Sequence, residues 1–351
     1  MEAHDWEYCA EGAMNIALRY VGLSQEFVGK VLRLRKASSN PETLLECHQF
    51  VESVMVPLIG REFCHENQVI ELTEEFLQHV EAKISPLRPH KRIKMGGLDL
   101  ASPLGLLMRD CSKLVCDECE SICFEIKPKW GFLPKEPTKF PIKHQVCRFT
   151  MHQHFKQTLS EYSPLDLFSL DKPRMLRALQ SLRANPQNNL KLFVNGNQVL
   201  DPKACAEYFT DDKFNLVIQV LLDTDVLSKV LCAQTVGSLV DIESVYPLYS
   251  RLEGVTNSPL GLPLPGDSSD KAKVDEFLIS CTARDCSIML TFAKCEHLHQ
   301  LALPQCQGFS YLLAVVDLDP KPYTKMNHYF ALDQEIAQAY TNRIKQEEEE
   351  E

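Results

Sequence analysis

Two aspartates at the ends of predicted strands are the residues best suited to chemistry in this sequence. Asp285 lies in Thr-Ala-Arg-Asp-Cys-Ser-Ile, and Asp317 lies in Val-Asp-Leu-Asp-Pro-Lys-Pro, where Asp319 and Lys321 follow it. Side chains at strand ends leave the sheet and can line a cleft, although aspartates are also common there as turn formers. Phosphoryl transfer requires one carboxylate to orient or deprotonate the attacking hydroxyl and another to hold magnesium. The pair therefore suits phosphoryl transfer.

Two basic segments could bind an anion beside these carboxylates. Lys127-Pro-Lys129 holds two lysines extended on either side of a proline, which suits a polyphosphate. Arg148, His152 and Lys156 recur at intervals of four, so a helix would place them on one face. Their mutual repulsion is understandable if an anion lies opposite them. Ordinary solvated basic surface gives the same two patterns.

A turn of small residues precedes the first basic strand. The segment Ala10-Glu-Gly-Ala-Met-Asn15 joins two short predicted strands, and Lys30 and Arg33 lie on the third. Backbone amides of such a turn can approach a phosphate, and a cation on the next strand can neutralise it. A simple hairpin followed by a basic strand face is the alternative interpretation.

The composition limits the class of protein. The 351 residues suffice for one large domain or two of ordinary size, and 44% hydrophobic with 24% charged residues is typical of a soluble globular protein. A net charge of −11 opposes non-specific binding to nucleic acid. No apolar run approaches the roughly 20 residues that a membrane helix needs, and Met1–Asp5 lacks the features of a signal peptide. We therefore expect an intracellular protein.

The 14 cysteines do not indicate a disulfide scaffold, because their density is too low. Cys111, Cys116, Cys119 and Cys123 cluster, but the second ligand pair that a zinc site usually has is missing. Reduced thiols in a loop and a strand are the simpler interpretation.

Hydrophobic periodicity predicts a mixture of strands and helices. The run 121–126 reads as a strand, and the proline-rich segment 130–140 after it is the predicted domain boundary. The glutamate-rich end, 346–351, is expected to be solvated and disordered. The remaining expected strands are 27–34, 190–194, 198–200, 286–292 and 311–318, and the expected helices are 41–54, 73–84, 144–159, 173–182, 214–230 and 333–344.

Six motifs, in order along the chain, together resemble the inositol-pentakisphosphate 2-kinase family. The resemblance runs from about Trp6 to Tyr340, nearly the whole chain. The motifs are Glu125-Ile-Lys-Pro-Lys-Trp-Gly-Phe-Leu-Pro134, Arg148-Phe-Thr-Met-His-Gln153, Pro164-Leu-Asp-Leu-Phe-Ser169, Gln187-Asn-Asn-Leu190, Ala283-Arg-Asp-Cys-Ser-Ile-Met289 and Asp317-Leu-Asp-Pro-Lys-Pro322.

This resemblance implies an α+β fold with two lobes, an inositol-phosphate kinase fold distantly like that of protein kinases, with ATP in the cleft between the lobes. Residues 1–126 would form the N-terminal lobe on the nucleotide side, residues 127–345 the C-terminal lobe, and residues 346–351 an acidic tail. The implied reaction is ATP-dependent phosphorylation of the 2-hydroxyl of inositol 1,3,4,5,6-pentakisphosphate, which gives inositol hexakisphosphate (phytate). The implied cofactors are ATP and Mg²⁺.

The resemblance also assigns roles to individual residues. Asp285 would be the catalytic base, Asp317 the principal magnesium ligand and Asp319 a weaker one. The residues implied to bind ATP are Glu11, Gly12, Ala13, Asn15, Arg33, Glu125 and Lys127. Those implied to bind the substrate are Arg88, Lys129, Arg148, His152, Lys156, Asn188, Lys321, Lys325 and Tyr329.

The sequence departs from the family pattern at a few positions. Ala10 stands where the family usually has glycine, so a positive φ there would strain the loop. Arg284 replaces the family's usual lysine before the catalytic aspartate, and Met108-Arg-Asp-Cys111 replaces the usual nucleotide contact. The segment 253–273 lacks the cysteines and histidines of the plant-like zinc insertion, so we expect no structural zinc.

The alternative is a non-catalytic inositol-polyphosphate-binding protein that retains the kinase fold. Both Asp285 and Asp317 speak against it, because a binder of polyanions gains nothing from aspartates beside the phosphates. Apart from the small-molecule substrate, we expect no membrane or nucleic-acid partner, a monomer, and a location in the cytoplasm, the nucleus or both.

Overall fold

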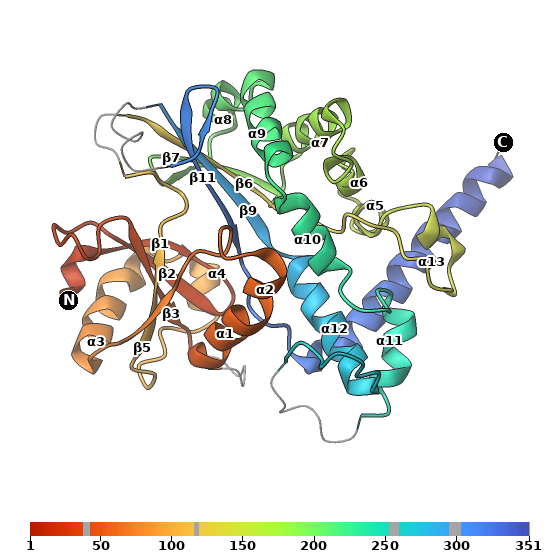
Figure 1. Ribbon diagram of the computed structural model, residues 1–351, viewed down its shortest axis with the longest axis horizontal. Helices are drawn as coiled ribbons and strands as arrows, with labels where there is room; N and C mark the ends of the chain where they lie inside the picture. The colour runs from red at the N-terminus through yellow and green to blue at the C-terminus, as the bar shows by residue number, and fades with distance from the viewer. Residues whose placement is uncertain (38–42, 116–118, 253–259, 295–302, 351) are drawn as a thin grey trace.

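The N-terminal part of the chain forms an antiparallel sheet with strand order β1-β2-β3-β5-β4 (Figure 1). The computed structural model describes residues 1–37, 43–115, 119–252, 260–294 and 303–350. Ala10 pairs with Ala17 in this sheet, and its φ is not in the left-handed region, so alanine causes no backbone strain there. The strands are β1 (Trp6–Glu11), β2 (Asn15–Tyr20), β3 (Lys30–Arg35), β4 (Gln68–Glu71) and β5 (Leu104–Arg109).

A second sheet, with order β10-β11-β9-β6-β7-β8, has antiparallel pairs throughout and positions the candidate site. Val316, the last residue of β11, pairs with Ser287, the first of β9, and Ile288 pairs with Ile126 at the end of β6. The end of β11, the start of β9 and the end of β6 therefore lie next to one another on one side of the sheet. The strands are β6 (Ser121–Ile126), β7 (Leu190–Val194), β8 (Asn197–Val199), β9 (Ser287–Ala293), β10 (Gln305–Cys306) and β11 (Phe309–Val316).

Most helices lie beside the second sheet and continue away from it, and α3 packs on the first (Figure 1). Thr73 caps α3 as expected: its Oγ1 accepts from the Phe76 N–H at 3.1 Å. The helices are α1 (Leu44–Phe50), α2 (Val56–Ile59), α3 (Glu74–Ile84), α4 (His90–Ile93), α5 (Arg148–Phe155), α6 (Pro164–Leu167), α7 (Lys172–Ala184), α8 (Pro202–Tyr208), α9 (Asp211–Asp223), α10 (Val226–Gln234), α11 (Ile242–Tyr249), α12 (Asp270–Ala283) and α13 (Met326–Glu350).

The largest hydrophobic core joins the second sheet to helices from both parts of the sequence. The helical segment that runs without a break from α1 to α2 packs into this core beside Leu290 of β9. Its buried side chains there include Phe50, Met55 and Ile59. The segment after α2 also contacts β11, because the Val315 N–H donates to the Phe63 carbonyl at 2.9 Å. The smaller sheet and α3 share a separate core.

The chain passes from the first sheet to the second between β5 and β6, because β6 pairs with β7 and β9 of the second sheet. Strand β6 was expected to close the N-terminal lobe, which was predicted to end at residue 126. That lobe boundary remains a prediction.

The predictions for three segments, two helices and the tail, need correction. The helix expected from residue 144 begins at Arg148, because Pro141–His144 forms a separate 3₁₀ turn and Cys147 caps the helix. The helix expected over 214–230 is two helices, separated after Asp223. The tail expected to be disordered continues α13 to Glu350. Glutamate and glutamine favour helix, and Arg343 pairs with Glu347 at 2.8 Å one turn later.

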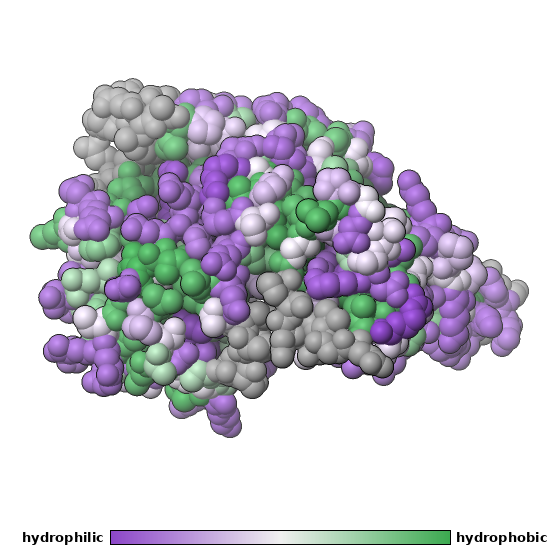
Figure 2. Space-filling model, turned by 60° about the horizontal axis from the view of Figure 1, so that its bottom comes forward, coloured by the Kyte–Doolittle hydropathy of each residue, from purple (hydrophilic) through white to green (hydrophobic). Residues whose placement is uncertain are grey.

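The face shown in Figure 2 is largely hydrophilic, and hydrophobic side chains form separate smaller areas on it. Among the described residues, no helix combines the length and the apolar character that crossing a membrane requires.

Candidate active site

Two aspartates and three lysines meet at the strand-end edge of the second sheet. Asp285 lies between α12 and β9, and Asp317 directly follows β11. Lys127 follows β6, and its Nζ lies 3.0 Å from Asp317 Oδ2. Lys129 Nζ and Lys321 Nζ lie 3.3 Å and 3.2 Å from the two oxygens of Asp285. The register of the three strands brings together residues nearly 200 positions apart.

The lysines keep both aspartates ionised. Partial desolvation by the surrounding protein acts to raise the pKa of Asp285, but Lys321, Lys129 and Lys127 lower it below its usual value. Partial desolvation likewise opposes ionisation of Asp317, and Lys127 again lowers the pKa. Burial lowers the pKa of Lys129, although Asp285 partly compensates. At neutral pH the site therefore presents two carboxylates, each next to an ammonium group.

A cavity of about 330 Å³ opens beside Asp285. Its wall includes seven of the nine residues that the sequence analysis placed on the substrate side. They are Lys129, Arg148, His152, Lys156, Asn188, Lys321 and Tyr329. Arg148, His152 and Lys156 come from α5 and its C-cap, as the spacing of four predicts. That this helix face binds an anion remains a prediction.

The wall also contains residues that the sequence analysis did not assign to it. Asn189 is 2% exposed, and its Oδ1 has no hydrogen-bond partner within the part of the chain that the structure describes. Its position directly after Asn188, inside a family motif, was the one available signal. Trp130 and Arg284 stack, with the guanidinium 4.4 Å from the ring centroid.

His152 is held neutral in this cationic wall. Burial, Arg148, Lys156 and Lys129 lower the pKa of His152 to about 3. In the unfolded chain its pKa returns to about 6.5, so the unfolded state binds more protons between these two values. Lowering the pH from 7 to 5 should therefore destabilise the wild type through His152 by about 1 kcal/mol, after discounting for its partial exposure.

Urea unfolding of the wild type and His152→Gln at pH 7 and pH 5 measures this contribution. The variant should lose about 1 kcal/mol less stability than the wild type between the two pH values. Equal losses in the two proteins would show that folding does not lower the pKa of His152.

Two of the residues expected on the substrate side are not among those that line this cavity. Arg88 is 4% exposed and pairs with Glu11, with Nη2 2.9 Å from Oε2. Its Nη2 also donates to the Gly96 carbonyl at 2.7 Å. Lys325 is exposed in a 3₁₀ turn just before α13. In this conformation neither cation contributes to the wall.

Five of the seven residues expected to bind the nucleotide lie in the N-terminal part of the chain, at three places. Asn15 and Arg33 line a smaller cavity of about 60 Å³ between the sheets, and both contact the carboxylate of Asp319. Gly12 and Ala13 are exposed at the turn between β1 and β2. Glu11 points inward, where Lys36 Nζ lies 2.6 Å from its Oε2.

Glu125 lies in the interior of the second sheet and accepts hydrogen bonds from two sides. Lys191 Nζ donates to both carboxylate oxygens at 2.9 Å, and Ser287 Oγ donates to Oε1 at 3.0 Å. Ser287 Oγ also lies 3.3 Å from Asp317 Oδ2. Glu125 is thereby connected to the aspartate at the strand end.

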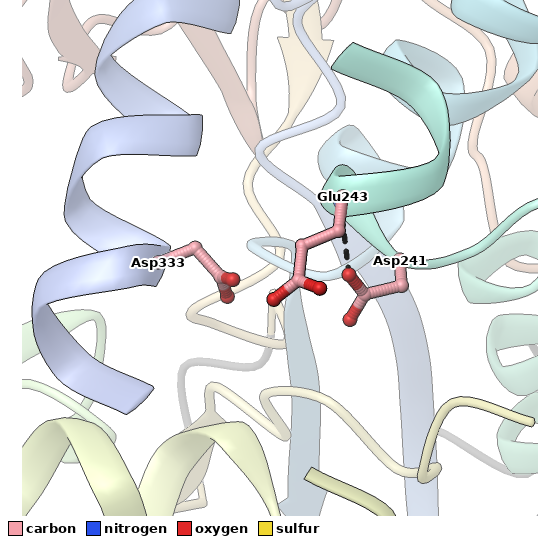
Figure 3. Close-up of side chains that lie close together, drawn as sticks. All are labelled: Asp241, Glu243 and Asp333. Carbon is pink, nitrogen blue, oxygen red and sulfur yellow. Dashed lines mark hydrogen bonds between the residues drawn. The ribbon is translucent and has the colours of Figure 1, made fainter. Parts of the chain in front are cut away.

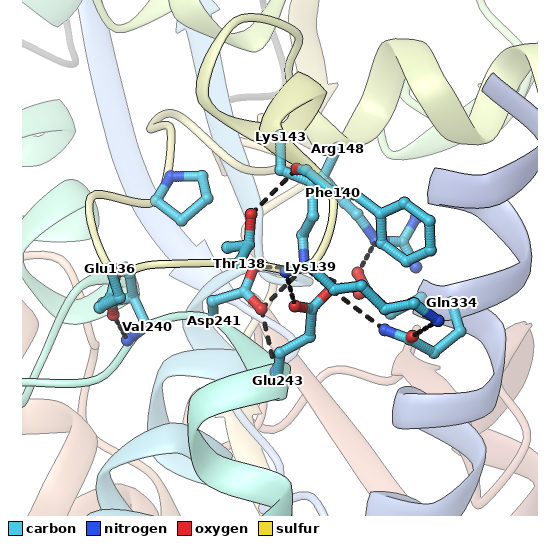
Figure 4. Close-up of polar contacts among 12 residues, drawn as sticks. Glu136, Thr138, Lys139, Phe140, Lys143, Arg148, Val240, Asp241, Glu243 and Gln334 are labelled. Carbon is cyan, nitrogen blue, oxygen red and sulfur yellow. Dashed lines mark hydrogen bonds and ion pairs between the residues drawn. The ribbon is translucent and has the colours of Figure 1, made fainter. Parts of the chain in front are cut away.

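A second acidic cluster includes Asp333 of the cavity wall (Figure 3). Ligand oxygens of Asp241, Glu243 and Asp333 lie within 4.8 Å of one another. Lys143 Nζ already lies among them, at 2.6 Å, 3.2 Å and 2.9 Å respectively (Figure 4). Asp333 also contacts Arg148, with Nε 3.3 Å from Oδ1. The ammonium group of Lys143 thus occupies the place that a metal ion would take between these carboxylates.

Removal of this buried ammonium should strongly destabilise the protein. We expect Lys143→Met to reduce the free energy of unfolding by about 3–5 kcal/mol at pH 7, because three clustered carboxylates lose the ammonium group that lies among them, and among the described residues only Asp333 keeps a second cation, Arg148. Urea unfolding gives the value, and Lys135→Met, at an exposed position of the preceding loop, is the matched control. A loss below about 1 kcal/mol would show that the cluster is not stabilised by Lys143.

The cysteine cluster is only partly within the described residues, because Cys116 lies outside them. Cys123 is buried in β6, and its Sγ contacts the Cys111 carbonyl at 3.7 Å. Burial raises the pKa of the Cys111 thiol to about 12. A thiol with so high a pKa is protonated at neutral pH and is a poor metal ligand. The expectation of no structural zinc remains a prediction.

Paired carboxylates and lysines beside a strongly basic cavity are typical of enzymes that transfer phosphoryl groups to anionic acceptors. Comparison with known sequences specifies the class. Residues 8–335 match the family described as inositol-pentakisphosphate 2-kinase, and the chain belongs to this family.

Curated relatives with that name come from animals and plants. The protein of Danio rerio is 30% identical, covering 97% of this chain and 94% of the relative. The protein of Arabidopsis thaliana is 29% identical, with 99% and 95% covered. A relative from Oryza sativa subsp. indica is 31% identical, with 97% and 94% covered.

Proposed function

We propose that this protein transfers the γ-phosphoryl group of ATP to the free 2-hydroxyl of inositol 1,3,4,5,6-pentakisphosphate, giving the hexakisphosphate. The observation that carries the proposal is Asp285, ionised between Lys129 and Lys321 at the wall of a cationic cavity. The family and the names of the relatives support the same reaction. Ala10, which departs from the family pattern, does not have the left-handed φ that would strain an alanine.

The substrate side is built to offset a large negative charge. A pentakisphosphate carries close to ten negative charges, and Lys129, Arg148, Lys156 and Lys321 converge on one cavity while the whole chain has a net charge of −11. Fixed cations in a partly buried wall interact more strongly with phosphate than surface cations do. The wall therefore binds and orients the inositol ring.

Asp285 would contact the attacking hydroxyl. Its lowered pKa makes it a weak base that is fully ionised at neutral pH. It can therefore accept a hydrogen bond from the hydroxyl, orient its lone pair, and receive the proton as the new bond to phosphorus forms. Lys129 and Lys321 would move from the carboxylate toward the phosphates of the bound substrate.

The nucleotide would lie toward the smaller cavity, between the two predicted lobes. Asp317 and Asp319 both line it, and carboxylate oxygens are the donors that Mg²⁺ prefers. The Asp317 side chain is 59% exposed, so an ion can reach it. Bound Mg²⁺ would neutralise charge on the phosphates of ATP. Arg33, Asn15 and the exposed turn at Gly12 and Ala13 are proposed to hold the same phosphates.

Arg88 and Lys325 are proposed to reach the substrate only after a movement. Arg88 would have to exchange Glu11 for a phosphate, which a closing motion of the N-terminal sheet would allow. Limited proteolysis of the segment 88–97 with and without inositol hexakisphosphate tests this closure, because closure should protect the segment. We also propose that the protein is intracellular and monomeric.

The reaction is tested by direct product analysis. The protein is incubated with Mg²⁺, ATP and inositol 1,3,4,5,6-pentakisphosphate, and the products are separated by anion-exchange chromatography. A hexakisphosphate product that requires both ATP and Mg²⁺ supports the proposal. Tight binding of the pentakisphosphate without turnover would instead support the non-catalytic binder.

A further inference from the structure

Gln234 connects the two segments that carry Lys129 and Asp285, and we propose that it is a positioning residue for phosphoryl transfer. The inference rests on the proposed function and adds a residue that belongs to none of the sequence motifs. Gln234 is the last residue of α10 and has no exposed surface.

The segment that carries Lys129 needs external support. Lys129 has φ of 59°, in the left-handed region, which a residue other than glycine adopts only when its surroundings enforce it. The preceding carbonyl, of Pro128, accepts a hydrogen bond from the buried hydroxyl of Tyr162 at 2.8 Å. The hydrogen bond from Tyr162 therefore holds the backbone on the N-terminal side of Lys129.

The side-chain amide of Gln234 supplies the contacts on the other side. Its Nε2 donates to the Lys129 carbonyl at 2.7 Å, and its Oε1 accepts from the Gly131 N–H at 2.9 Å. One amide therefore binds the chain on both sides of Trp130. This geometry fixes the turn from which the Lys129 ammonium reaches into the cavity.

The same residue also holds the segment that carries Asp285. Gln234 Nε2 lies 3.4 Å from the Ala283 carbonyl, and the Gln234 main-chain carbonyl accepts from Arg284 Nε at 3.1 Å. Asp285 follows directly, and its Oδ1 is 3.3 Å from Lys129 Nζ. Gln234 therefore sets the position of a substrate-binding lysine relative to the proposed base.

An amide of this length both donates to the Lys129 carbonyl and accepts from the Gly131 N–H. Glutamate would retain an acceptor for Gly131 but would offer no donor to the Lys129 carbonyl, and methionine would offer neither. The two substitutions therefore remove one or both contacts while they preserve the approximate volume of the side chain.

The Michaelis constants distinguish positioning from a purely structural role. We expect Gln234→Met to raise KM for the pentakisphosphate about tenfold, because Lys129 is displaced, and to leave KM for ATP within about twofold. A purely structural residue would lower only the active fraction, so that both KM values stayed unchanged and the proposal failed. Thr291→Val is the matched control, since Thr291 is fully buried on β9 and donates to the Cys111 carbonyl at 2.5 Å, away from both segments.

A double-mutant cycle tests whether the effect passes through Lys129. In a Lys129→Met background, Gln234→Met should change KM for the pentakisphosphate by less than about twofold. A further tenfold rise would overturn the proposal. Gln234→Glu is measured in parallel and should also raise this KM, which keeps the test decisive if the methionine variant does not fold.

The positioning role of Gln234 can be tested even if the protein does not catalyse the proposed reaction. If the wild type does not transfer phosphate, calorimetric titration with inositol hexakisphosphate replaces the kinetic assay. A roughly tenfold weaker affinity in Gln234→Glu supports the positioning role even then, and an unchanged affinity overturns it.

Discussion

Asp285→Asn should lower kcat for transfer to the pentakisphosphate by about 10³-fold while substrate affinity stays within about tenfold. The amide retains the shape of the side chain but cannot accept the proton of the attacking hydroxyl. Affinity should not fall strongly, because the substitution removes a negative charge from a polyanion site. It also frees Lys129 and Lys321, which pair with the carboxylate in this structure.

Two measurements are needed for this prediction. Product chromatography gives kcat, and calorimetric titration with the pentakisphosphate gives the affinity. Asp270→Asn is the matched control, because Asp270 is a partly exposed residue at the opposite end of α12, the helix that leads into Asp285, and pairs there with Arg251. A large loss of affinity with little change in kcat would assign Asp285 to substrate binding instead of proton transfer.

The sequence predicted the acidic and basic groups of the site because each lies in a short segment with its own pattern. Asp285 and Asp317 flank apolar runs of strand length, and Arg148, His152 and Lys156 share a helical face through their spacing. What the segments could not show was the pairing of Val316 with Ser287, which depends on register across the sheet.

Residues that act through tertiary packing left no pattern to find. Gln234 ends an ordinary apolar helix, and nothing near it indicates that its amide binds the segment around Lys129. Lys143 belongs to none of the sequence motifs, and only the fold surrounds it with carboxylates from α11, its cap and α13. The inward position of Arg88 likewise follows from Glu11, which was expected at the phosphates but points into the protein.

Asp317→Asn should lower kcat by about 10³-fold and raise the Mg²⁺ concentration needed for half-maximal rate. The reason is that the amide retains only a neutral oxygen where a hard divalent cation prefers a carboxylate. Asn is the informative substitution here because Asp317 has φ of 62°, a conformation that asparagine tolerates as well as aspartate. The effect on the rate therefore reports the lost charge and not a change of backbone.

Titration of the initial rate with Mg²⁺ at saturating ATP separates Asp317 from its neighbour. Asp319→Asn should have a smaller effect, about tenfold in kcat, because the Asp319 carboxylate already pairs with Arg33 and Asn15. Asp317→Ala should match Asp317→Asn in rate but lose about 1 kcal/mol more stability, since alanine tolerates the left-handed conformation poorly. A stronger loss in Asp319→Asn than in Asp317→Asn would make Asp319 the principal ligand and leave Asp317 as the anchor of Lys127.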